Sequence, residues 1–200
     1  MIQEQLAFLP ESLPDYQPFP PAKERTAWQA LPLRAKQRFL QAGETALQTS
    51  LAPLPLTLWL DFTRTGRRTA WETAYFSRRA RLCALVCAEC VEHKGRFLDA
   101  IADTVWTLCE ESAWQLPAHN SYVRDTPQLP LPDTTRPIVE LFSAETGALL
   151  ALTRCLLQDE LDAAAPGITA RMERELNVRI LTPYFTKPLL VDGQWQRTDV

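Results

Sequence analysis

The chain has 200 residues, 46% of them apolar, which is typical of a folded globular domain and excludes a disordered or collagen-like chain. Basic residues number 21 against 24 acidic ones, and the net charge of −3 argues against a nucleic-acid-binding protein with a globally basic surface. Five cysteines, an odd number without paired spacing, argue against a secreted disulfide framework and favour reduced thiols.

The sequence indicates neither a targeting signal nor a membrane span. The first ten residues contain an acid, Glu4, and lack a basic segment followed by an apolar one. The longest uncharged run, residues 45–60, is interrupted by two prolines and is too short to cross a bilayer. We therefore expect a cytoplasmic protein with no membrane partner and no nucleic-acid partner.

Prolines divide the chain into an arm and a helical domain. Residues 1–31 hold five prolines and predict an extended arm, because proline lacks the backbone donor that a helix interior needs. The domain spans residues 32–200. Apolar residues at helical spacing predict five helices in it, over residues 33–50, 69–94, 97–116, 137–157 and 166–180.

The remaining segments of the domain are a short strand and a long loop. Residues 57–62 have the pattern of a strand, and Thr69 and Glu72 have the spacing of a capping box at the next helix. Residues 117–136 form a loop of about twenty residues, a length that is uncommon unless the loop is functional. The fold class is therefore all-α, built from long helices joined as antiparallel hairpins.

Cys83, Cys87, Cys90 and His93 are residue types that bind zinc, but one straight helix spreads them along its length. A zinc site needs donors about 2.0–2.3 Å from a single point, whereas ten helical residues rise about 15 Å. We therefore expect no metal site and no cofactor, and interpret the three cysteines as small core side chains that face another helix.

Residues 64–81 contain six arginines and a single acid. For Arg78, Arg79 and Arg81 we favour a solvated helix face with ion pairs. Arg64 is placed by the pattern in a loop ahead of a helix N-terminus. Both features hold anions well, so a sulfate or a uronate carboxylate is a plausible partner of Arg64.

The densest polar segment, residues 109–120, lies where the third helix ends and the long loop begins. Trp114 offers a flat face for a sugar ring, while Glu111, His119 and Asn120 offer hydrogen bonds to hydroxyl groups. The same residues fit a structural role, with Trp114 filling the core and His119 donating to a carbonyl. Spacing alone leaves both interpretations open.

Four stretches of the chain are similar to a known protein family: residues 61–68, 75–82, 109–119 and 141–147. Together they resemble the heparinase II/III-like family of polysaccharide lyases, in the same order over about residues 28–185. The most specific part is Glu-Glu-Ser-x-Trp-x-x-Pro-Ala-His, at residues 110–119.

This resemblance implies an N-terminal (α/α) toroid, with helical hairpins around a central funnel, followed in the family by a large β-sandwich. Family members cleave acidic polysaccharides by β-elimination, in which a base removes the C5 proton of a uronic acid whose carboxylate is neutralised. The family's catalytic tyrosine and neutralising group are expected beyond Val200. The catalytic residues of this chain are therefore unknown, and we expect an incomplete toroid that is inactive alone.

Three functions remain open. The chain is the sugar-facing portion of a lyase, with Glu111, Trp114, His119 and Asn120 lining the funnel and Arg64 binding an anionic group. Alternatively it is a non-catalytic helical module that binds acidic oligosaccharide or a protein, or a scaffold in which these side chains only cap and pair. An incomplete toroid leaves an apolar edge, which predicts self-association through the last helix.

Overall fold

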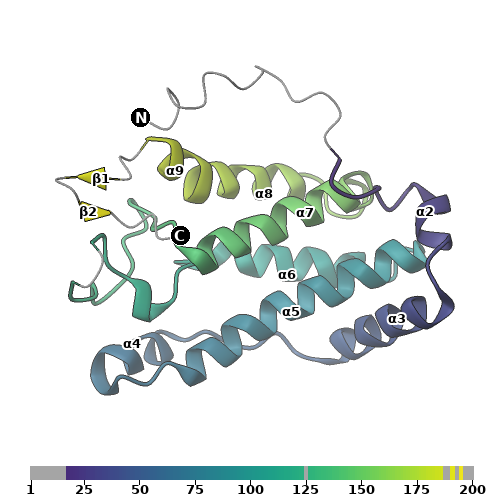
Figure 1. Cartoon of the computed structure of the whole chain (residues 1–200). Coiled ribbons are helices and arrows are strands. Elements are labelled where there is room, and N and C mark those ends of the chain that lie inside the picture. Colours follow the sequence, from purple (N-terminus) through teal and green to yellow (C-terminus); the bar gives the residue numbers. More distant parts are fainter. Residues whose placement is uncertain (1–16, 124–125, 187–189, 192–193, 196–200) are drawn as a thin grey trace.

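The computed structural model describes residues 17–123, 126–186, 190–191 and 194–195. Helices make up nearly all of the regular structure in this part of the chain, which confirms the all-α fold class (Figure 1). Two short strands, β1 (Leu190–Val191) and β2 (Gln194–Trp195), form an antiparallel pair near the C-terminus.

All five predicted helices are present. Most ends lie within four residues of the prediction, but the helix predicted over residues 97–116 ends at Glu110 and the one predicted over residues 137–157 continues to Ala164. The helices are α2 (Arg25–Gln29), α3 (Leu33–Gln48), α4 (Leu56–Thr65), α5 (Thr69–Glu92), α6 (Leu98–Glu110), α7 (Leu141–Ala164), α8 (Ile168–Leu176) and α9 (Thr182–Thr186). A 3-10 turn, η1 (Pro117–His119), follows α6, and a π-helical turn, η2 (Asn177–Leu181), joins α8 to α9.

Successive long helices pack side by side (Figure 1). The packing of α3 against α5 depends on Gly43, because a Cβ atom there would collide with the Cβ atom of Ala88. Near the other end of this contact, Arg81 of α5 donates to the carbonyl of Ala46. These two contacts show that α3 and α5 run antiparallel.

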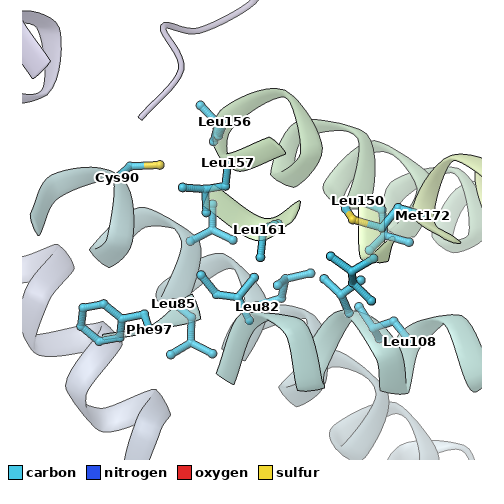
Figure 2. Packing of buried hydrophobic residues seen from close by; sticks show 14 of the residues in the cluster. Leu82, Leu85, Cys90, Phe97, Leu108, Leu150, Leu156, Leu157, Leu161 and Met172 are labelled. Carbon is cyan, nitrogen blue, oxygen red and sulfur yellow. The ribbon is translucent and has the colours of Figure 1, made fainter. Parts of the chain in front are cut away.

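The main core lies between α5, α6, α7 and α8 (Figure 2). Leu82 of α5, Leu108 of α6, Leu161 of α7 and Met172 of α8 are all fully buried there. Each such side chain contributes about 1.5–3 kcal/mol by leaving water. A second, smaller cluster joins α4 and the start of α5 to the segment after α6, and it contains Trp59, Trp71, Tyr75, Ala113 and Leu116.

The strand predicted over residues 57–62 is wrong, because this segment lies in helix α4. A short apolar run fits a buried strand and a helix equally well, and tertiary packing decides between them. Here Pro55 precedes the helix and Trp59 buries one face of it. The capping box is also wrong: Arg68 is the N-cap and its side chain pairs with Glu72.

The predicted arm differs from the structure in its second half. Residues 1–16 lie outside the described residues. Within residues 17–31, the chain forms helix α2, and the amide of Ala22 donates to the carbonyl of Leu156 at 2.8 Å. Arg25 donates to the last carbonyls of α5, those of Cys90 and Val91, at 2.7 Å each. Residues 17–31 are therefore hydrogen-bonded to the helices and do not form an extended arm.

Of Cys83, Cys87 and Cys90, which are predicted to be core side chains, one is fully buried. Cys90 is fully buried, as predicted, and lies near Leu156 and Leu157 in Figure 2. Cys83 is exposed and Cys87 is half-buried, so the core position predicted for Cys83 is wrong. Within the described residues, no group of three potential ligands is arranged to bind a metal, and no helix has the length and hydropathy to cross a membrane.

Candidate functional site

Glu111 is the first residue after α6 and its carboxylate is buried. It accepts from Arg78 Nη1 at 2.9 Å and from Arg79 Nη2 at 2.7 Å, and both arginines are buried as well. The solvated face predicted for Arg78 and Arg79 is therefore wrong. Their partner lies more than thirty residues away in sequence, so no local pattern reveals it.

Two further arginines fix the end of α6. Arg179 of η2 donates to the carbonyl of Cys109 at 2.9 Å and to that of Glu111 at 2.6 Å. Arg171 of α8 also donates to the Cys109 carbonyl, at 3.3 Å, and pairs with Glu110 at 3.0 Å. These bonds satisfy helix-end carbonyls that would otherwise lack donors. They hold the segment after α6 in one position.

Trp114 and Asn120 serve the fold of this segment. Trp114 is 2% exposed, and its indole N–H donates to the carbonyl of Leu108 at 2.9 Å. A buried indole has no free face on which a sugar ring could stack. Asn120 is fully buried, accepts from Gln115 at 3.1 Å and donates to the carbonyl of Leu129 at 2.8 Å. The Asn120 amide therefore connects Gln115, which lies before η1, with Leu129 in the loop after η1.

His119 differs from these residues because one of its ring nitrogens stays open. Its Nδ1 lies 2.8 Å from Oε2 of Glu140, which is 1% exposed and also caps α7 by accepting from the amide of Ser143. The His119 side chain is 25% exposed. Its Nε2 has no partner among the described residues and is not one of their buried unpaired atoms.

A buried carboxylate beside Nδ1 fixes the histidine in a defined tautomer. The carboxylate accepts from Nδ1–H, so in the neutral ring the lone pair is on Nε2, where it can accept a proton or a hydrogen bond. The ring also stacks on Phe142, with centroids 5.8 Å apart and planes 14° apart. Phe142 in turn contacts the exposed Phe76, edge to face, at 5.2 Å.

Tyr75 links the Glu111 cluster to the His119 pair. Its hydroxyl donates to the carbonyl of Trp114 at 2.6 Å and lies 2.9 Å from Oγ1 of Thr146. The guanidinium of Arg79 stacks on its ring. Burial raises the pKa of Tyr75 well above its usual range, so the hydroxyl stays protonated and acts as a donor.

The structure brings together four of the five predicted site residues. Glu111, Trp114, His119 and Asn120 lie in one connected segment. The loop position predicted for Arg64 is wrong, because Arg64 lies exposed in the last turn of helix α4, where no described residue forms an ion pair with it. Sequence reasoning missed Glu140 and Phe142, although an acid directly before a helix is a known capping signal.

Two hollows adjoin the segment after α6, and both are lined by Ser112, Ala113 and Thr134. The smaller, about 150 Å³, also touches Trp114 and Arg179. The larger, about 460 Å³, is lined by α4, the start of α5 and the loop after η1; we name it the α4 cavity. No protein-family model matches the chain, and no curated protein matches it.

Proposed function

We propose that the chain is the helical, toroid-type portion of a protein similar to heparinase II/III-like lyases, and that it contacts uronic-acid-containing polysaccharide through His119. The observation that carries the proposal is the His119–Glu140 pair, in which a buried carboxylate orients a partly exposed imidazole. Around it, Glu110, Glu111 and Trp114 of the motif are occupied by bonds within the fold, whereas His119 keeps Nε2 without a partner among the described residues.

The chemistry of this pair suits an acidic sugar. When protonated, the imidazolium keeps Nδ1–H on Glu140 and offers Nε2–H to a uronate carboxylate or a sulfate. When neutral, Nε2 can accept a proton, which is the role of a general base in β-elimination. The ring of Phe142 stacks on the imidazole and contacts the exposed ring of Phe76 in turn, so the two phenylalanines offer a sugar ring an apolar surface.

The test is binding of polygalacturonate and heparin, measured by calorimetry with His119→Asn. The asparagine amide keeps an N–H where Nδ1 donates to Glu140 and removes Nε2. We expect affinity to fall by about tenfold or more, which corresponds to about 1.4 kcal/mol. Unchanged affinity in this variant, or no binding by the unaltered chain, would overturn the proposal.

His93 supplies a matched control. It is the other histidine of the chain, it also pairs with a glutamate, Glu160, at 2.8 Å, and its side chain is 30% exposed. Its φ of 55° lies in the left-handed region, which asparagine tolerates well. His93→Asn should therefore leave polysaccharide binding unchanged.

Turnover is tested separately. Elimination creates a carbon–carbon double bond whose ultraviolet absorbance reports the reaction. We propose that residues 1–200 bind without turnover, and that a rise in absorbance abolished by His119→Asn would show a complete catalytic set instead. Binding without a rise, kept by the control variant, supports the proposal.

A further inference from the structure

We propose that the α4 cavity binds a carboxylate carried on an apolar or ring-shaped body. The cavity is lined by Trp59 of α4, by Trp71 and Arg78 of α5, and by Glu111, and Leu131 lies at its edge. This site lies beyond the proposed function and does not depend on it, because His119 does not line the cavity.

The first argument is charge. Arg78 and Arg79 are both buried, and Glu111 is the carboxylate that bonds them both. The three groups therefore carry one excess positive charge. Glu110 also lines the cavity, but its side chain is 52% exposed and it pairs with Arg171. A buried cation that lacks a full counter-charge is costly, so a monoanion in the cavity would be favoured.

The second argument is unused donors. Arg78 donates through Nε to the carbonyl of Ala52 at 2.7 Å and through Nη1 to Glu111 at 2.9 Å, while its Nη2 has no partner among the described residues. Trp71 is 7% exposed, and its indole N–H is buried without an acceptor. Both side chains line the cavity, and a carboxylate has two oxygens that accept from such donors.

The third argument is the shape and character of the walls. Trp59 and Trp71 meet edge to face at 5.1 Å, and Leu54 extends their apolar surface. At the edge, Leu56 is 55% exposed and Leu131 is 47% exposed. The volume, about 460 Å³, falls within the range of small-molecule sites, about 300–1,000 Å³. An apolar wall beside two donors selects a ligand with a ring and one acidic group.

Two sources of this chemistry exist, a free apolar acid and the uronic acid of a saccharide, and the probes separate them. The unaltered chain is titrated with benzoate, benzamide, glucuronate and glucose, and binding is followed through the indole N–H signals in NMR spectra. We expect at least one acid to bind about tenfold more tightly than its neutral counterpart. Binding of benzoate alone identifies a free apolar acid, and binding of glucuronate a uronic acid.

Two variants locate the site without disturbing the Glu111 cluster. Trp71→Phe keeps an aromatic wall and removes the unpaired N–H, and Leu131→Glu places a negative charge at the exposed edge. Each should weaken acid binding by about tenfold. Arg67→Gln, which removes an exposed cation outside the cavity lining, is the matched control and should change nothing.

Three results would overturn the inference. They are failure of both acids to bind, an affinity of both acids no higher than that of their neutral counterparts, and acid binding that Leu131→Glu leaves intact. None of these results bears on polysaccharide binding at His119, so the two proposals fail independently.

Discussion

Glu111 and Glu140 are both buried carboxylates, 8% and 1% exposed, yet they serve different ends. Glu111 bonds two buried arginines, whose charge is permanent. Glu140 bonds the partly exposed His119, whose Nε2 has no partner among the described residues. The comparison separates a carboxylate whose bonds lie within the fold from one that orients a partly exposed histidine.

The largest expected effect on stability comes from breaking the ion pairs of Glu111 with Arg78 and Arg79. Glu111→Gln leaves Arg78 and Arg79 buried without their counter-charge, and we expect the free energy of unfolding to fall by about 3–5 kcal/mol. Urea denaturation followed by circular dichroism measures it. Glu110→Gln, which removes an exposed carboxylate, is the control and should cost about 1 kcal/mol or less. Equal losses in the two variants would contradict the claim that the buried ion pairs of Glu111 stabilise the fold.

An intermediate effect is expected at the second carboxylate. Glu140→Ala removes the cap of α7 and the partner of His119, and the loss should be about 2 kcal/mol. It stays below that of Glu111→Gln because His119 can bond water instead. Glu145→Ala, at an exposed position of α7, is the control for thermal unfolding. A loss larger than that of Glu111→Gln would reverse the comparison.

Tyr75, which connects the two carboxylate regions, predicts a pH dependence. Its pKa is raised in the folded chain and returns to about 10 on unfolding, so its contribution is complete below pH 10 and is lost as the pH rises further. The slope is at most about 1.4 kcal/mol per pH unit. Urea unfolding from pH 9 to 11 should show a shallower decline in Tyr75→Phe. The same decline in both proteins would contradict the burial of this hydroxyl.

The smallest expected effect on stability is that of His119→Asn. The amide keeps a donor for Glu140, so the free energy of unfolding should change by about 0.5 kcal/mol or less. Differential scanning calorimetry measures it beside His93→Asn. A loss comparable to that of Glu111→Gln would show that His119 stabilises the fold as Glu111 does. It would remove the basis for a ligand-binding role.

The apolar patch predicted to be exposed on residues 168–180 is wrong for the first part of this range. Ile168 and Met172 are buried against α7 and the core, whereas Val178 and Leu181 of η2 are about half exposed. Self-association through this region stays a prediction, and sedimentation of the chain with Val178→Lys tests it. A monomer at all concentrations would contradict it.

Local patterns were sufficient for five of the helices but not for α4 or for the partners of charged side chains. The five long helices follow from apolar spacing and flanking prolines, which act within a few residues. The α4 segment failed because a short apolar run suits two structures. Arg78 and Arg79 failed because Glu111 reaches them only after α5 and α6 fold back on each other.

By itself the sequence determined that this chain is helical, where its long helices lie, and which short segment gathers polar and aromatic groups. Only the tertiary structure decided which of these groups form bonds within the fold and which keep a donor or acceptor available to a ligand. The physical reason is that helix formation depends on neighbours in the chain, whereas the burial of Trp114 and the pairing of His119 with Glu140 depend on helices that meet in space.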